Sequence, residues 1–320
     1  MNLSPHFLNP FDNPIVPAVL LRLGLIYGIA FILILLIKKG NLRSVFSSNV
    51  GQRLIGWLIL TPIFFIGVFC GGIPGLIVLF IFTAGAILEY AKIAHLTPSF
   101  RNALILLSVI SLLIVGFMPN SFYVLPLVYF LVITPLAIRL NTPDKSFLQA
   151  SISMYGAIWI IFSLCHLVLL TRLSLQFDST RALTFLVIFA VALADIGGYI
   201  FGKLFHHFKV LDNYKVADKL SPNKTYIGTL GYIIGALMGI SLFYFAVGPY
   251  MNVVQWIMVG IIIGIFSFIG GLTHSYFKRY FGVKDSGRII PGHGGVMDRI
   301  DSISRVGVIL YYFLLVFIVN

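Results

Sequence analysis

The sequence predicts an all-α, polytopic integral membrane protein with about ten transmembrane helices. Its 320 residues are 59% hydrophobic and only 10% charged, and the mean hydropathy is +1.01. A soluble domain needs a more highly charged surface than this composition can supply. Because about 20 apolar residues cross a bilayer as a helix, we expect most of the chain to lie within lipid.

Ten apolar runs of suitable length predict the individual spans. Breaks that contain glycine or proline, such as residues 71–74 and 118–120, separate several of these runs. The predicted spans are 18–37, 54–70, 74–94, 102–118, 121–139, 149–170, 182–202, 226–248, 253–273 and 303–319.

The distribution of basic residues supports this count and orients the spans. Of the 22 Lys and Arg residues, 19 follow predicted spans one, three, five, seven and nine, and only Arg22, Arg172 and Arg181 fall on the other side. Since cytoplasmic loops are enriched in Lys and Arg, these basic loops are predicted to be cytoplasmic and both termini external, in a bacterial inner or cell membrane. This accounts for the net charge of +12 without a nucleic-acid partner.

The chain is predicted to divide into two functional regions. Residues 1–180 form N-terminal scaffold helices, in which Glu89 is one of few polar exceptions. Residues 181–320 form a C-terminal transmembrane region with two long polar loops, at about 203–225 and 274–302. Because two spans separate these loops, they lie on the same face, where helix packing could bring them together.

Two aspartates near the end of the chain are candidates for catalysis. Asp298 and Asp301 are three residues apart, so both carboxylates share one face if this segment opens the last helix. Two neighbouring carboxylates suit Mg²⁺, which binds one or two protein carboxylates together with substrate phosphates. The alternative is structural, since Asp301 with Ser302 and Ser304 could cap the last helix.

A glycine-rich turn and several cations surround these aspartates. His293, Gly294 and Gly295 could form a turn whose backbone N–H groups hold phosphate, or an ordinary turn. Positive side chains here would offset the charge on phosphate oxygens during phosphoryl or nucleotidyl transfer, or would bind lipid headgroups nonspecifically. The candidate cations are Lys278, Arg279, Lys284 and Arg299.

Polar residues in and before the loop at 203–225 add to this group. Ser221, Lys224 and Thr225 immediately precede an apolar helix, whose N-terminus could hold an anion. They could instead cap that helix, with the lysine side chain reaching the interface. Asp195 lies inside an apolar run, where an acid is costly and is usually paired or functional.

Residues 275–301 read SYFKRYFGVKDSGRIIPGHGGVMDRID. This segment closely resembles the signature of the phosphatidate cytidylyltransferases, also called CDP-diacylglycerol synthases. Residues 195–203 and 221–225 are similar to two further motifs of that family. The resemblance covers about residues 190–305.

The resemblance implies an enzyme that makes CDP-diacylglycerol and pyrophosphate from CTP and phosphatidic acid with Mg²⁺ as cofactor. Lys278, Asp298 and Asp301 would be catalytic, with Mg²⁺ on Asp298 and Asp301 and a further carboxylate from Asp195. Membrane lipids and a homodimeric partner are further expected contacts. The substrate-binding residues would be Ser221, Lys224, Thr225, Arg279, Lys284, His293, Gly294, Gly295 and Arg299.

Four positions depart from the family pattern. Gly271 and His274 stand where the family usually has Asp and Glu, and Asn223 and Ile227 stand where it usually has Lys and Glu. Two alternatives therefore stay open. One is a non-catalytic or altered-specificity paralogue that binds or transports phospholipid, and the other is a CTP-dependent polyprenol or phytol kinase-like enzyme.

Overall fold

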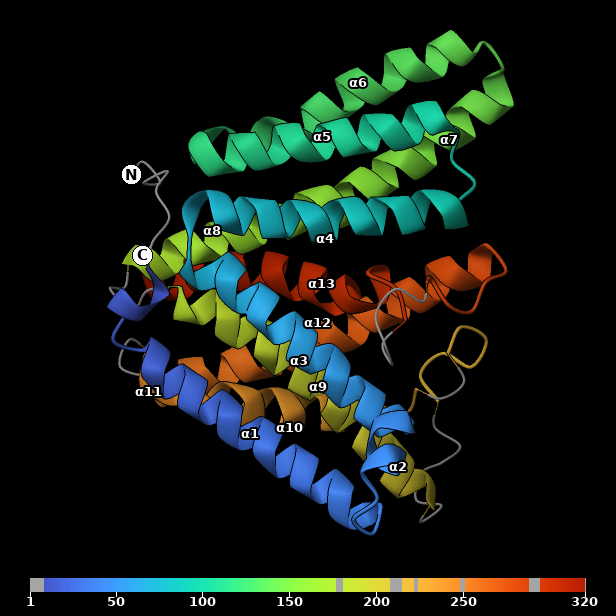
Figure 1. Ribbon diagram of the computed structural model, residues 1–320. Coiled ribbons are helices and arrows are strands. Elements are labelled where there is room, and N and C mark those ends of the chain that lie inside the picture. Colours follow the sequence, from blue (N-terminus) through green and yellow to red (C-terminus); the bar gives the residue numbers. More distant parts are fainter. Residues whose placement is uncertain are drawn as a thin grey trace.

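The computed structural model describes residues 9–176, 181–207, 215–221, 224–247, 251–287 and 294–319. Regular structure in this part is helical (Figure 1), apart from one antiparallel bridge between Lys215 and Thr225. The elements, of which η3 and η5 are π-helical, are η1 (Pro10–Asp12), α1 (Val16–Ile37), α2 (Leu42–Ser47), α3 (Asn49–Phe69), α4 (Gly72–Ile93), α5 (Pro98–Phe117), η2 (Pro119–Val124), α6 (Leu125–Leu140), α7 (Pro143–Gly156), η3 (Ala157–Phe162), α8 (Ser163–Gln176), α9 (Ala182–His207), α10 (Tyr226–Leu242), α11 (Tyr244–Val247), α12 (Val253–Tyr280), α13 (Met297–Leu314) and η5 (Leu315–Val319).

Among the described residues, nine helical segments are long and apolar enough to cross a membrane. The eighth predicted span, 226–248, corresponds to the shorter helix α10, which has 17 residues and gives way to α11 after Phe243. At 1.5 Å per residue α10 is about 26 Å long, slightly less than a hydrocarbon core of about 30 Å. The prediction of an all-α, multi-pass membrane protein is confirmed, with one span shorter than expected.

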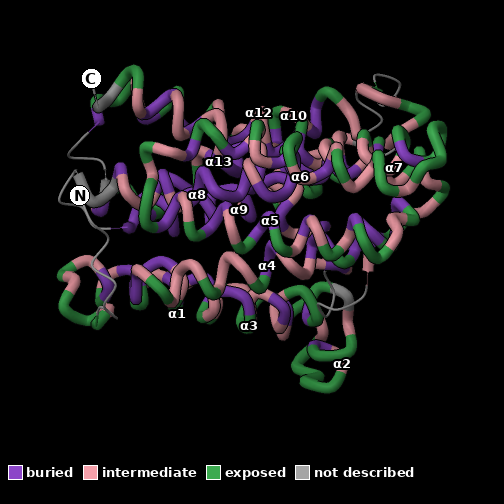
Figure 2. The backbone as a smooth tube through the Cα atoms, turned by 90° about the horizontal axis from the view of Figure 1, so that it is seen from above, coloured by how far each residue is buried: buried purple, intermediate pink, exposed green. Residues whose placement is uncertain are grey.

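Burial separates a central group of helices from a periphery suited to lipid. Figure 2 shows buried backbone concentrated around α8, α9 and α13, whereas α1 lies at the edge and carries few buried residues. In their most apolar windows, 67% of the residues of α9 are buried but only 11% of those of α1. Exposed apolar side chains on α1, such as Leu25 and Ile29, are the surface expected against lipid. The central helices therefore form the frame that positions the polar groups.

Small residues allow α9 and α10 to approach closely. Gly231, Gly235 and Gly239 recur at four-residue spacing along α10. A Cβ atom on Gly235 would lie 2.9 Å from the carbonyl carbon of Leu193, and one on Gly239 would lie 2.7 Å from the Cα atom of Ala190. Such stripes of small residues are typical of close helix pairs in membranes, where backbones come near enough to pack directly.

We expect Gly235→Val to destabilise the protein much more than Gly202→Val. Both substitutions place the same side chain on a packed pair of helices, but a Cβ at Gly202 meets no atom within 4 Å. The new side chain at position 235 meets backbone atoms, which cannot rotate away, so overpacking should cost about 1–3 kcal/mol or more. The measurement is the midpoint of thermal unfolding of each purified variant. Equal midpoints would show that the close α9–α10 contact does not contribute to stability.

The helix ends that carry polar residues gather at one end of the molecule. In Figure 1, α1 begins and α13 ends at the left, whereas α9 and α12 end, and α10 and α13 begin, at the right. The described residues of the two polar loops are therefore on one face, as the span count predicted. Assignment of this face to the cytoplasm is a prediction from the positive-inside rule.

Candidate active site

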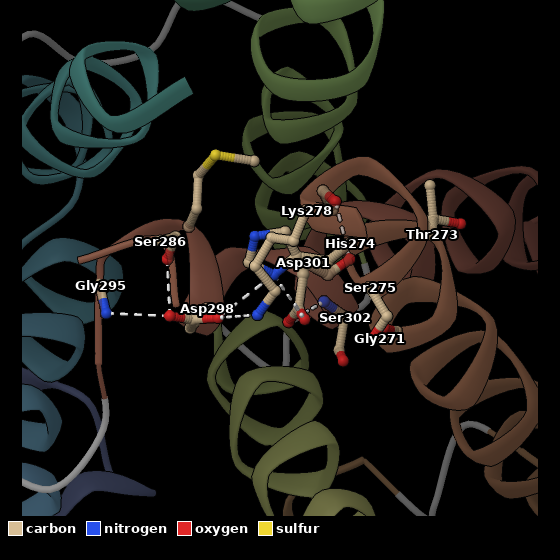
Figure 3. A network of polar contacts seen from close by, with 12 residues as sticks. Gly271, Thr273, His274, Ser275, Lys278, Ser286, Gly295, Asp298, Asp301 and Ser302 are labelled. Atoms are coloured by element: carbon tan, nitrogen blue, oxygen red, sulfur yellow. Dashed lines mark hydrogen bonds and ion pairs between the residues drawn. The ribbon is translucent and has the colours of Figure 1, made fainter. Parts of the chain in front are cut away.

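Asp298 lies at the centre of the polar cluster, in the first turn of α13. Lys278, in the last turn of α12, donates from Nζ to Asp298 Oδ1 at 2.8 Å. The other oxygen, Oδ2, accepts from the Ser286 hydroxyl at 2.6 Å and from the Gly295 amide at 3.0 Å. Figure 3 shows these donors converging on the carboxylate from two sides. Both oxygens of Asp298 are thus bound by protein groups.

His274 lies between the two aspartates that the sequence singled out. Its Nδ1 atom is 3.4 Å from Asp298 Oδ1 and 3.4 Å from Asp301 Oδ2 (Figure 3). The side chain is 1% exposed, and its Nε2 atom is buried without a hydrogen-bond partner in the described structure. The sequence predicted no role for this residue and marked it only as a departure from a family pattern.

Asp301 is not the cap of the last helix. The helix begins at Met297, so Asp301 lies a full turn inside it, and the structural alternative weighed from the sequence is wrong for this residue. Its Oδ1 atom accepts from the Ser302 amide at 2.7 Å, while Oδ2 faces His274. The close approach of α12 depends on Gly270, where a Cβ atom would lie 2.6 Å from the carbonyl oxygen of Asp301.

Lys224 reaches the cluster from the segment that precedes α10. Its Nζ atom donates to the carbonyl oxygen of Phe268 at 3.2 Å. A Cβ atom built on Gly271 would lie 2.5 Å from this Nζ atom and 4.0 Å from Asp301 Oδ2. The amine therefore occupies the space that a side chain at position 271 would enter. Burial lowers the pKa of Lys224, and the nearby Asp301 and Asp195 carboxylates oppose that shift.

Asp195 joins the same cluster from α9. Its carboxyl group interacts with Asp301, Arg299, Lys224 and the hydroxyl of Tyr232. An acid in an apolar helix was expected to have such partners. The packing of α9 against α10 and α12 brings it next to residues more than 25 positions away in the chain.

The remaining candidates around the loop at 203–225 differ in their structural roles. Thr225 accepts the Gly228 amide at 3.0 Å and caps α10, which agrees with the structural interpretation of that residue. Ser221 is partly buried in the turn before Lys224. Arg279 Nε donates to the carbonyl oxygen of Leu220 at 3.5 Å, so the two polar loops contact one another, as the sequence suggested.

Three further candidates lie along residues 284–299. Lys284 is exposed. Arg299 is partly buried, its Nε atom has no hydrogen-bond partner in the described structure, and it interacts electrostatically with Asp301 and Asp195. His293 lies outside the described residues.

Glu89, on α4, is the main residue that sequence reasoning left out of the site. Its Oε1 and Oε2 atoms accept the backbone amides of Val296 and Met297 at 2.9 and 2.8 Å. A carboxylate at a helix N-terminus satisfies free N–H groups and complements the positive end of the helix dipole. The sequence signal was present, because this is the only Glu in the chain and it lies inside a long apolar run. The division at residue 180 remains a prediction, and Glu89 extends the site into the first region.

The glycine turn before α13 is packed between two carboxylates. Gly294 has a φ of +80°, and a Cβ atom there would lie 2.7 Å from Asp298 Oδ2. Gly295 fits against the Glu89 carboxylate and the Ser286 hydroxyl, where a Cβ would clash. The amide of Gly295 already donates to Asp298, so binding of substrate phosphate by Gly294 and Gly295 stays a prediction.

The donors present do not fit a magnesium ion held by the protein alone. Among the described residues, no three His, Cys, Asp or Glu side chains are arranged to hold a metal ion. Mg²⁺ requires near-octahedral oxygen ligands at about 2.0–2.1 Å. Here Asp298 is bound on both oxygens, and an amine and an imidazole lie beside Asp301. The Mg²⁺ expectation therefore stays a prediction from the spacing of the two aspartates and from the family resemblance.

Comparison with known proteins identifies the family to which the chain is similar. The model of the cytidylyltransferase family matches residues 51–317. The uncharacterized protein YnbB of Escherichia coli strain K12 is 34% identical over 210 residues, which are 63% of this chain and 66% of that protein.

Two staphylococcal relatives match a shorter region. The phosphatidate cytidylyltransferases of Staphylococcus haemolyticus and Staphylococcus aureus strain COL are 46% identical over 112 residues and 45% identical over 115 residues. Each of these matches covers 35% of this chain and 41% of the relative. The chain thus matches less than two thirds of the length of each of the three relatives.

Proposed function

The chain belongs to the cytidylyltransferase family, and we propose that it is a membrane-embedded nucleotidyltransferase that moves the cytidylyl group of CTP onto a lipid phosphate. The observation that carries this proposal is the convergence of Lys224, Lys278 and Arg299 with Asp298 and Asp301 at one end of the spans. Cations at the end of a helix bundle are suited to phosphate groups that arrive both from water and from lipid headgroups.

The lipid substrate of the proposal is phosphatidic acid, because the two staphylococcal relatives are phosphatidate cytidylyltransferases. An oxygen of the lipid phosphate attacks the α-phosphorus of CTP in line. The bond from that phosphorus to the oxygen bridging to the β-phosphate breaks, and pyrophosphate leaves with the electron pair. The products are CDP-diacylglycerol and pyrophosphate.

The side chains present are suited to hold and stabilise these groups. Lys278 has two ammonium protons left after its bond to Asp298 and can donate them to phosphate oxygens. Asp298 fixes the position of that amine, and the Ser286 and Gly295 donors fix Asp298 in turn. Preorganised cations of this kind stabilise the charge that develops on the transferring group and the leaving pyrophosphate.

Orientation of the site toward the cytoplasm, where CTP is available, is part of the proposal and rests on the positive-inside rule. The multi-pass architecture places the cluster at the end of spans, so a phospholipid could present its headgroup without leaving the bilayer. A nucleotide and a membrane lipid are the partners that this position supports.

The test is a transfer assay with CTP labelled at either of two phosphates. Purified protein in phosphatidic acid-containing nanodiscs should move label from [α-³²P]CTP into the organic phase, and none from [γ-³²P]CTP, because pyrophosphate leaves with the γ-phosphate. Nanodiscs with diacylglycerol in place of phosphatidic acid are the matched control and should yield no labelled lipid.

The same assay separates the alternatives. With a polyprenol or phytol added to the nanodiscs, transfer of γ-label to that alcohol would identify a kinase-like enzyme. No labelled lipid under any condition, together with retained phosphatidic acid binding, would identify a lipid-binding or lipid-transporting paralogue. Either result would overturn the proposal.

A further inference from the structure

Given the proposed function, the contacts of His274 determine whether a metal ion can lie between the two aspartates of the site. Asp298 Oδ1 and Asp301 Oδ2 both face the same ring nitrogen, at 3.4 Å each. A point shared by two carboxylate oxygens is where a divalent cation is commonly held. In this chain a buried imidazole occupies that point, with its ring packed near Trp159, so no open position remains between the two carboxylates.

A second group closes the other side of Asp301. The Lys224 amine lies 2.5 Å from where a Cβ atom of residue 271 would be, and that position is 4.0 Å from Asp301 Oδ2. Phe268 anchors this amine through its carbonyl oxygen, and its ring lies 5.0 Å from Nζ. Glycine at position 271 is what leaves room for the lysine, since any side chain there would displace its end.

Formal charge is balanced without a metal ion among the six described side chains around Asp301; the Glu89 carboxylate, bound by two backbone amides, lies outside this group. The carboxylates of Asp195, Asp298 and Asp301 interact with the cationic side chains of Lys224, Lys278 and Arg299. A group in which carboxylates and cations are equal in number has no excess negative charge to attract a divalent cation. Both oxygens of Asp298 are also already used by protein donors.

We propose that His274 and Lys224 replace a resident divalent-metal site, so that the protein without nucleotide binds no Mg²⁺ or Mn²⁺ at the cluster. A divalent ion then enters only as part of a metal–CTP complex. Positions 271 and 274 determine whether the protein itself can hold a divalent ion. The residues there decide whether the space beside Asp301 holds an amine and an imidazole or additional carboxylates.

The first test measures Mn²⁺ binding to the purified full-length protein without nucleotide. The readout is the electron paramagnetic resonance signal of free Mn²⁺, which decreases when the ion binds. We expect the free-ion signal to be undiminished by wild-type protein. Stoichiometric Mn²⁺ binding without CTP that is lost in Asp298→Asn would overturn the proposal.

The second test rebuilds the carboxylates. The double variant Gly271→Asp/His274→Glu changes the formal charge of the cluster by two units and removes the imidazole. We expect its Mn²⁺ affinity to exceed that of the wild type by at least about tenfold, which corresponds to about 1.4 kcal/mol. Unchanged affinity in a folded double variant would count against the proposal.

Thr273→Asp is the matched control for added charge. It places a new carboxylate on the same helix, and Figure 3 shows Thr273 on the side of α12 away from the cluster. No gain in Mn²⁺ affinity is expected for this variant, and a gain equal to that of the double variant would refute a local effect. If the double variant does not fold, the Mn²⁺ measurement on the wild-type protein still tests the proposal.

The transfer assay run on the same preparation separates this inference from the proposed function. Labelled lipid together with tight Mn²⁺ binding in the absence of CTP would refute the inference alone. Absence of labelled lipid without Mn²⁺ binding would refute the proposed function and leave the replaced metal site supported.

Discussion

Asp298→Asn should lower the initial rate of cytidylyl transfer by about 10²–10³-fold, the loss typical of removing one preorganised electrostatic group. The carboxylate accepts Lys278 on one oxygen and Ser286 and Gly295 on the other. An amide has only one oxygen, so its NH₂ group must face a donor on one of the two sides. Lys278 or the turn before α13 then loses its anchor. The measurement is the rate at which α-label from CTP enters lipid.

Asp285→Asn provides the control for this substitution. Asp285 lies in the same segment but is exposed, and we expect its loss to change the rate by less than about twofold, as is usual for surface substitutions. A similar rate in Asp298→Asn and wild type would show that Asp298 is dispensable for transfer. Lys278→Met should cause a loss comparable to Asp298→Asn, and the double variant should be scarcely slower, because residues that act as a unit are not additive.

Glu89→Ala should cause the largest loss of stability of any single substitution considered. The substitution leaves the buried amide of Met297 and the partly buried amide of Val296 without their acceptors. Each unsatisfied buried donor costs about 1–3 kcal/mol, so the expected total is about 2–6 kcal/mol. Transfer activity should also fall, because the first turn of α13 carries Asp298. The midpoint of thermal unfolding and the transfer rate are the two measurements.

Glu89→Gln tests the mechanism of this effect. Glutamine keeps one acceptor oxygen, so we expect a loss intermediate between wild type and Glu89→Ala. Asp144→Ala is the control, since Asp144 is an exposed acid in the first turn of α7 and should contribute about 0.3–1 kcal/mol at most. A Glu89→Ala midpoint no lower than that of Asp144→Ala would contradict the role of Glu89 as a cap.

Several features of the fold and site were predictable because they depend on local sequence. Hydropathy located every span, although α10 is shorter than its apolar run because the helix ends at Leu242. The spacing of Asp298 and Asp301 correctly placed both on one face of α13, and both carboxylates face His274. The contact between Arg279 and Leu220 agrees with the expectation that the two loops meet.

Other features depend on contacts between distant segments, which a sequence pattern does not report. Glu89 lies more than 200 residues before the helix that it caps, and only the packing of α4 beside α13 makes it an acceptor. The sequence left open whether Asp301 caps the last helix, because the start of that helix depends on the Glu89 contact. The close contact of Gly235 and Gly239 with α9 likewise emerges only from helix packing.

The sequence by itself determined that this is a multi-pass α-helical membrane protein whose residues 275–301 resemble a family signature, because hydropathy, charge and motif spacing are properties of neighbouring residues. Only the tertiary structure decided what fills the space around Asp301. In the sequence, Gly271 and His274 were two missing acids. In three dimensions they are the positions that admit the Lys224 amine and an imidazole, because the distance between side chains from α10, α12 and α13 is set by helix packing and not by separation along the chain.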